Sequence, residues 1–287
     1  MGEVSVRIPA HIADRMLVNG RESFAVPPGD RGFLYGEGVF ETIAVHNARP
    51  LNLDHHLARL SRGCERLFIP PPNTERISAE AYRLVGGHEC AVLKIMVTGG
   101  EGDRGYAPPK KRSPNRFLRL FPWPHGIKRF DRAGVAVKVC ETRLAINPRL
   151  AGIKHLNRLE QVLAGAELDA AYGEGIVLDF EGNAVEGTSA NLMLISSGAL
   201  LTPDLSRCGI EGVMRELVLE TALRLDIPTQ VRTVSLDEVM EAESLFFTNV
   251  VRGIQPVVRA EERHFKIHPW IDALQEAVQG FEISNDR

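Results

Sequence analysis

Strand-like and helix-like segments follow one another in this chain without a regular rhythm, and this irregular order constrains the fold most. Runs rich in β-branched and aromatic residues are joined by turns rich in Gly, Asn and Ser, and amphipathic segments interrupt them. A regular alternation of strand and helix is typical of parallel, doubly wound sheets, whereas an irregular mixture is typical of α+β proteins. The sequence therefore predicts an α+β fold.

Strands dominate the expected structure of the first half of the chain. Asn19-Gly20 lies between two short strand-like runs and predicts a hairpin, because this residue pair favours a type I′ turn. A strand over residues 38–45 should lead into a helix capped by Asp54, and further strands are expected over residues 91–98 and 116–121. The apolar face of the helix is predicted to carry Leu57, Leu60, Cys64 and Leu67.

The second half begins after a short connector with two prolines and a glycine, residues 122–126. We expect a domain boundary there, between a smaller domain of residues 1–124 and a larger domain of residues 125–287. The larger domain should open with a strand over residues 135–140. A helix is then predicted directly after Lys154, with Leu156, Leu159, Leu163 and Ala166 on its apolar face.

Short strands and one long helix complete the predicted elements of the larger domain. The strands are expected over residues 176–180, 184–186 and 192–195, where turn-forming residues separate them. The helix is expected over residues 213–225, with its buried face at Leu217, Thr221 and Leu225.

Composition argues against nucleic-acid and membrane partners. The net charge is −3 and no dense basic stripe is present, so we expect no nucleic-acid surface. No apolar run approaches the roughly 18 residues that cross a bilayer, and the N-terminus lacks the apolar core of a signal peptide. We therefore expect a cytoplasmic protein.

Cysteine and histidine spacing gives no sign of a metal site. Cys64, Cys90, Cys140 and Cys208 are widely separated and are predicted to be buried free thiols. His264 and His268 have the spacing of a helical metal pair, but Pro269 follows directly and no carboxylate lies between them. We therefore expect no metal.

Lys154 is the first candidate for chemistry. It follows a small-residue turn in the segment 147–161, where burial would lower the pKa of its amine and make it a nucleophile or base. Most lysines are solvated surface charges, so the interpretation depends on partners elsewhere in the chain.

Four further segments contain residues suited to a ligand. Glu186 ends a predicted strand before small and hydroxyl residues, and 208–215 places glycines at a helix N-terminus that favours phosphate. Thr248-Asn249 follows an apolar strand, and Arg59 lies at the edge of its helix's apolar face. A lysine, a carboxylate and a phosphate cup are the parts of a pyridoxal phosphate site. Each residue alone also has an ordinary structural interpretation as a surface charge or a turn residue.

Five segments together resemble the fold-type IV pyridoxal-phosphate enzymes, which include branched-chain and D-amino-acid aminotransferases and aminodeoxychorismate lyases. They are Asp30-Arg-Gly-Phe-Leu-Tyr-Gly-Glu-Gly-Val-Phe-Glu-Thr42, Leu53-Asp-His-His-Leu-Ala-Arg-Leu60, Lys154, Glu186-Gly-Thr-Ser-Ala-Asn191 and Gly209-Ile-Glu-Gly-Val-Met-Arg215. The resemblance implies a two-domain fold with the cofactor, pyridoxal 5′-phosphate, in the cleft between the domains. It also implies a homodimer.

The resemblance assigns roles to individual residues. It makes Lys154 the lysine that binds the cofactor, Glu186 the partner of the pyridine nitrogen and Arg59 a phosphate ligand. It completes the phosphate cup with the backbone of Ile210 and Glu211 and with Thr248 and Asn249.

The segment around Lys154 distinguishes the members of the family. Asn147-Pro-Arg-Leu-Ala-Gly-Ile-Lys-His-Leu-Asn-Arg-Leu-Glu-Gln161 resembles the lysine segment of aminodeoxychorismate lyases. Branched-chain aminotransferases place a tyrosine after the lysine, near the ring oxygen of the cofactor, where this chain has Leu159. The resemblance thus favours a lyase that converts 4-amino-4-deoxychorismate to 4-aminobenzoate and pyruvate. A branched-chain or D-amino-acid aminotransferase is the alternative, and a pseudoenzyme on the same scaffold is a third.

The lyase interpretation asks for a base, an acid and a cation. Lys154 would remove the proton from the amine-bearing carbon, and Thr42 or Lys154 would protonate the leaving group. Arg104, in the glycine-rich loop 99–114, is the candidate for binding a substrate carboxylate, with a plain surface arginine as the equal alternative.

Overall fold

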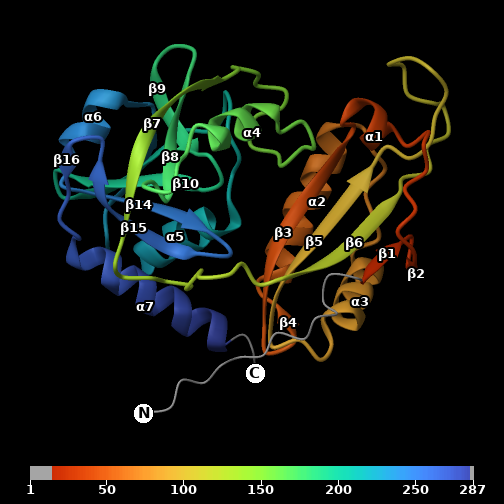
Figure 1. Ribbon diagram of the computed structural model, residues 1–287, viewed down its shortest axis with the longest axis horizontal. Helices are drawn as coiled ribbons and strands as arrows, with labels where there is room; N and C mark the ends of the chain where they lie inside the picture. The colour runs from red at the N-terminus through yellow and green to blue at the C-terminus, as the bar shows by residue number, and fades with distance from the viewer. Residues whose placement is uncertain (1–14, 285–287) are drawn as a thin grey trace. The chain divides into compact units, whose positions relative to one another are not determined.

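A computed structural model describes residues 15–284 of the chain, and it divides into two compact units, Met1–Ile127 and Lys128–Arg287 (Figure 1). Each unit combines a sheet with helices, which confirms the predicted α+β class. No helix within residues 15–284 is long and apolar enough to cross a membrane.

The first unit is built on a six-stranded antiparallel sheet with the order β2-β1-β6-β5-β3-β4. Its strands are β1 (Met16–Val18), β2 (Arg21–Glu22), β3 (Gly38–His46), β4 (Arg49–Pro50), β5 (Cys90–Thr98) and β6 (Arg116–Pro122). Its helices are α1 (Arg31–Tyr35), α2 (Leu53–Arg66) and α3 (Thr74–Val85). Every second side chain of a strand points to the same face of the sheet. On the face that packs against α2 and α3, residues such as Ile43, Leu93 and Leu118 form the apolar core of this unit.

Most local predictions for this unit are confirmed, including the hairpin at Asn19-Gly20. The predicted cap of α2 is wrong, because Asn52 holds the N-cap position and Asp54 lies in the first turn. Asp54 still stabilises the helix there, since a carboxylate in the first turn interacts favourably with the helix dipole. Helix α3 was not predicted from the sequence; its N-cap Asn73 accepts a hydrogen bond from the Arg76 N–H at 2.7 Å.

The second unit is built on a ten-stranded mixed sheet with the order β12-β11-β10-β14-β15-β7-β8-β9-β13, and β16 pairs with β15. Its strands are β7 (Val135–Leu144), β8 (Glu174–Asp179), β9 (Asn183–Gly187), β10 (Asn191–Ser196), β11 (Ala199–Pro203), β12 (Thr229–Arg232), β13 (Val234–Ser235), β14 (Ser244–Asn249), β15 (Gly253–Ala260) and β16 (Arg263–His264). Its helices are α4 (Leu159–Ala166), α5 (Val213–Arg224), α6 (Leu236–Glu241) and α7 (Pro269–Ser284).

Both faces of the central strands of this sheet are buried. Leu192 and Leu194 of β10 belong to one apolar core, whereas Met193 of the same strand packs into another together with residues of α5 and α7. In Figure 1 these two helices lie along the same side of the sheet, consistent with their direct contact. Burial on both faces explains why the sequences of β10 and β14 contain apolar residues in unbroken runs.

The predicted apolar face of α4 is wrong. The helix begins at Leu159 instead of directly after Lys154, and Leu159 and Leu163 are 76% and 59% exposed. Ala164 is the buried residue of this helix, because it packs against Cys140 in a small core below α4. On α5, Leu217 and Thr221 are buried as predicted, but Leu225 lies beyond the helix end and is exposed.

Three of the cysteines are buried free thiols as predicted, and the fourth, Cys90, is exposed at the start of β5. The part of the chain from 15 to 284 contains no group of His, Cys, Asp and Glu side chains suited to a metal ion.

Candidate functional site

The backbone around Lys154 is fixed by a second segment that is distant in sequence. Gly152 N–H donates to the Gly209 carbonyl at 2.9 Å, and Glu211 N–H donates to the Gly152 carbonyl at 3.1 Å. Gly152 has φ +80°, a conformation that side chains disfavour, so glycine permits this turn. Lys154 is half-buried in the irregular segment between this turn and α4.

Glu186, at the end of β9, lies close to Lys154. It is buried, and its Oε2 accepts a 2.8 Å hydrogen bond from Ile210 N–H. Burial raises the pKa of Glu186 to about 7, although the Ile210 N–H and the nearby cations Arg158 and Lys154 lower it in part. The structure therefore brings together the predicted residues Lys154, Glu186 and Ile210.

Two polar side chains that were not predicted as site residues, Arg158 and Gln161, lie close to Glu186, and a third, His155, contacts Arg158. All three line a cavity of about 210 Å³. Gln161 Nε2 is 3.5 Å from Glu186 Oε1, and Arg158 Nη2 is hydrogen-bonded to His155 Nε2. The sequence signal that could have found them is their spacing of three residues from one another, directly after Lys154 and leading into α4.

These three side chains carry buried atoms that lack a hydrogen-bond partner among the described residues. The atoms are His155 Nδ1, Arg158 Nε and Gln161 Oε1. Buried polar groups are nearly always paired, so unpaired ones at a cavity point to a ligand or ordered water. By contrast, Leu159, which the family resemblance set in the place of the tyrosine, is exposed, and Arg158 is the residue that acts on Glu186.

Thr248 and Asn249, at the end of β14, have different environments. Thr248 is 2% exposed, and its Oγ1 has no hydrogen-bond partner within residues 15–284. The amide of Asn249 instead holds two loops, because Nδ2 donates to the Ser189 carbonyl at 2.6 Å and Oδ1 accepts from Val251 N–H at 2.8 Å. Thr248 is thus available to a ligand through its side chain, whereas the amide of Asn249 is engaged.

The N-terminus of α5 has no side-chain cap. Gly212 holds the N-cap position, and a Cβ built there would lie 2.0 Å from Asn191 Oδ1. Asn191 is held in place because its Nδ2 donates to the Ile210 carbonyl at 2.7 Å. The Ile210 and Glu211 N–H groups, assigned to the phosphate cup by resemblance, already donate to Glu186 and Gly152, respectively. The helix terminus itself is therefore the part of this segment suited to an anion.

Arg59 lies in the first unit and is more buried than its predicted place at a helix edge implied, with 6% exposure. Its Nε donates to Glu41 Oε1 at 2.8 Å and its Nη2 to Oε2, while His56 Nδ1 lies 2.6 Å from the same Oε2. Burial favours the protonated form of Glu41, but Arg59 and His56 outweigh it and lower the pKa to about 2. Glu41 therefore fixes the orientation of the Arg59 guanidinium.

Thr42 and Arg104 also belong to the first unit. Thr42 is half-buried on β3 and pairs with Lys94 of β5, whose Nζ lies 4.8 Å from the centre of the Phe40 ring. Arg104 is exposed, in a loop that the buried Arg31 anchors by hydrogen bonds of 2.9 Å to the carbonyls of Gly105 and Tyr106.

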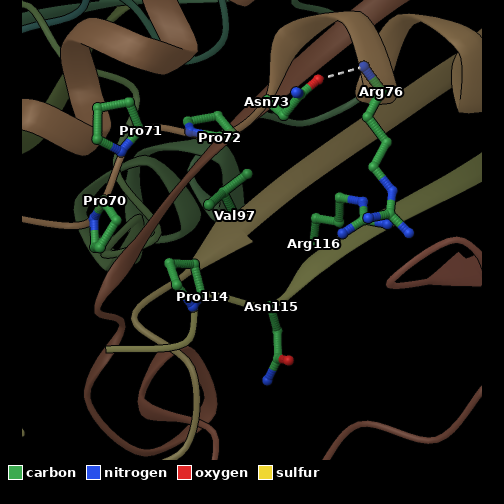
Figure 2. A pocket seen from close by; sticks show the side chains of 9 residues that line it. All are labelled: Pro70, Pro71, Pro72, Asn73, Arg76, Val97, Pro114, Asn115 and Arg116. Atoms are coloured by element: carbon green, nitrogen blue, oxygen red, sulfur yellow. Dashed lines mark hydrogen bonds between the residues drawn. The ribbon is translucent and has the colours of Figure 1, made fainter. Parts of the chain in front are cut away.

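The polar side chains that line a cavity of about 180 Å³ in the first unit are paired with other protein groups. Figure 2 shows that the cavity is lined by Pro70, Pro71, Pro72, Asn73, Arg76, Val97, Pro114, Asn115 and Arg116. Both arginines pair with Glu80, at 3.4 Å and 2.7 Å, so the carboxylate balances their charge. The amide of Asn115 is also satisfied, by Asp30 and Asn19.

Comparison with known proteins identifies the family. A model of the amino-transferase class IV family matches residues 38–260. The chain belongs to this family. It is 34% identical to an aminodeoxychorismate lyase of Vibrio harveyi over 92% of this chain and 97% of that protein. A putative branched-chain-amino-acid aminotransferase of Methanocaldococcus jannaschii is 30% identical, over 82% of each chain.

A solved structure supports the same relationship. The crystal structure of 4-amino-4-deoxychorismate lyase from Pseudomonas aeruginosa has a TM-score of 0.88 and 43% sequence identity to this chain. The similarity covers 92% of this chain and 98% of that one, so it includes both units.

Proposed function

We propose that this protein is a pyridoxal-phosphate-dependent lyase that converts 4-amino-4-deoxychorismate to 4-aminobenzoate and pyruvate. The observation that carries the proposal is the 43% identity to the Pseudomonas aeruginosa lyase over nearly the whole of both chains. The 34% identity to the Vibrio harveyi lyase supports it.

The polar groups of the second unit fit the cofactor. Lys154 offers the amine that binds it, and Glu186 offers a carboxylate for the ring nitrogen. The unpaired Thr248 Oγ1 and the uncapped N-terminus of α5, which follows Ile210 and Glu211, suit the phosphate. Asn249 holds the adjoining loop, and Arg59 is our candidate for a further phosphate ligand. When bound, the cofactor supplies an electron sink for the carbon that carries the substrate amine.

The residues of the chain supply acid–base chemistry and orientation. Lys154 removes the proton from the amine-bearing carbon, and the charge of Glu186 keeps the ring nitrogen protonated. Either Thr42 or Lys154 protonates the departing enolpyruvyl group. Arg104 binds a substrate carboxylate, for which its exposed guanidinium is suited.

A product assay tests the proposed reaction. The purified protein, loaded with pyridoxal phosphate, is incubated with 4-amino-4-deoxychorismate without any 2-oxo acid. We expect 4-aminobenzoate and pyruvate in equal amounts, and the loss of both products in Lys154→Ala. Amino transfer to 2-oxoglutarate without elimination would overturn the lyase proposal.

An aminotransferase is the second candidate, because the Methanocaldococcus jannaschii relative bears that name. Branched-chain and D-amino acids, each offered with 2-oxoglutarate, distinguish the two activities. Formation of glutamate from these substrates, at a rate above that of 4-aminobenzoate release, would favour the aminotransferase.

We also propose a homodimer located in the cytoplasm. Leu159, Val162 and Leu163 of α4 are 59–76% exposed, and a cluster of exposed apolar side chains is typical of an interface. The four free cysteines suit a reducing compartment. Light scattering of the purified protein should give twice the chain mass of 31.7 kDa, and a monomer at micromolar concentration contradicts the dimer.

A further inference from the structure

The pair His155 and Arg158 presents two buried hydrogen-bond donors. Arg158 Nη2 always carries hydrogen, so His155 Nε2 must accept in their mutual hydrogen bond. Burial and the Arg158 charge lower the pKa of His155 to about 4, so the ring is neutral at pH 7. Its one proton then lies on Nδ1. Both His155 Nδ1 and Arg158 Nε are therefore N–H donors, and neither has a partner in the described chain.

Two unpaired donors in a buried setting call for an acceptor with negative charge. An unsatisfied buried donor lowers the stability of the folded state, and an unpaired buried guanidinium lowers it more. Among the described residues, the titratable groups that face Arg158 are Glu186, Glu160 and His155. Because no carboxylate within residues 15–284 bonds to the two donors themselves, an anionic oxygen of a ligand is the group that would satisfy them.

Glu186 indicates which oxygen this is, given the proposed function. Pyridoxal phosphate has two anionic groups, its phosphate and its ring oxygen. The phosphate is accounted for by Thr248 and the N-terminus of α5. Arg158 instead interacts with Glu186, the proposed partner of the ring nitrogen, and Lys154 interacts with the same carboxylate. The neighbours of Arg158, Glu186 and Lys154, are thus the residues proposed to hold the ring of the cofactor.

We propose that Arg158, oriented by His155, donates a hydrogen bond to the ring oxygen of the cofactor. Arg158 then has the role that a tyrosine has in branched-chain aminotransferases, and Leu159 has no part in it. The inference rests on the proposed use of pyridoxal phosphate by this protein. A cationic donor stabilises the ionised form of the ring oxygen more than a neutral hydroxyl does.

The test is a pH titration of the visible absorbance band of the bound cofactor. We expect Arg158→Lys, which keeps the charge but removes the Nε–H, and Arg158→Gln to raise the midpoint of the titration by about one pH unit or more. We also expect the dissociation constant for pyridoxal phosphate, measured by equilibrium dialysis of the cofactor-free protein, to rise about tenfold. Arg224→Lys, the same change at an exposed position of α5, should leave both quantities unchanged.

The outcomes separate this inference from the proposed reaction. If both Arg158 variants bind the cofactor with the midpoint and affinity of the unsubstituted protein, Arg158 does not contact the ring oxygen. If the unsubstituted holoenzyme releases no 4-aminobenzoate, the lyase proposal fails, but the titration midpoints still decide the role of Arg158. If the unsubstituted protein develops no visible band with pyridoxal phosphate, both are overturned.

Discussion

Ile210 N–H donates a 2.8 Å hydrogen bond to Oε2 of Glu186, and this bond links the segment before α5 to the buried carboxylate. The same segment holds the turn before Lys154 through Gly152. The lysine, the carboxylate and the N-terminus of α5 are therefore fixed relative to one another by backbone hydrogen bonds. A functional group placed in this way needs little reorganisation when a ligand binds.

The cofactor-free protein should lose stability as pH rises through the titration range of Glu186. Burial raises the folded-state pKa from 4.5 to about 7, so the folded state retains a proton that the unfolded chain releases in this interval. The free energy of unfolding should fall by on the order of 3 kcal/mol between these pH values. Urea denaturation at a series of pH values measures it. Glu186→Gln should remove this part of the slope, and an equally steep slope in the variant contradicts the assignment.

Removal of the Glu41 carboxylate should destabilise the first unit strongly. Glu41→Ala leaves the buried Arg59 guanidinium without its bidentate partner, which costs about 3–5 kcal/mol. Glu181→Ala, which breaks an exposed pair with Arg207, should cost at most about 1 kcal/mol. Denaturant unfolding compares the two variants.

The same ion pair makes a prediction for acid conditions. The pKa of Glu41 is lowered from 4.5 to about 2, so its stabilisation is fully present above pH 4.5 and is lost as pH falls through 2. Glu41→Ala should therefore lose less stability than the unsubstituted protein over this interval. Parallel acid unfolding curves for the two proteins would contradict the lowered pKa.

Thr248→Val should separate cofactor binding from stability. Valine has nearly the same shape and lacks the unpaired Oγ1, so the cofactor-free protein should be as stable as before or slightly more stable. The affinity for pyridoxal phosphate should fall about tenfold, because one ligand of the phosphate is lost. Thr98→Val, in the first unit, is the control. Its buried Oγ1 donates to Asp30 Oδ2 at 2.7 Å, so that change should destabilise the protein by about 1–3 kcal/mol and leave affinity unchanged.

Gly212→Ala should disturb the N-terminus of α5. A Cβ at this position would lie 2.0 Å from Asn191 Oδ1, and Asn191 is buried and bonded to the Ile210 carbonyl. The clash should cost about 1–3 kcal/mol in unfolding experiments and weaken cofactor binding. Gly165 lies in α4 with open space around it, so Gly165→Ala should raise the free energy of unfolding by up to about 1 kcal/mol. Equal stability of the two variants would mean that Asn191 moves freely.

Sequence patterns predicted the elements of both units where the pattern is local. The run of β-branched and aromatic residues in β3 and the Asn19-Gly20 turn were sufficient, because a strand and a hairpin depend on residues close together in the chain. The prediction that the apolar residues at the start of α4 are buried was wrong because it also used only local spacing. A helical spacing shows which residues share a face, but it does not show whether that face is covered.

The sequence by itself determined the chemistry available to this protein, since the amine of Lys154, the carboxylate of Glu186 and the hydroxyl of Thr248 are fixed by residue identity. Only the tertiary structure decided how these groups are paired. Asn249 is engaged in a loop while Thr248 is unpaired, and Arg158 instead of Leu159 acts on Glu186. The physical reason is that hydrogen-bond partners and burial come from segments distant in sequence, such as Glu186 and Ile210, whose contact no local pattern encodes.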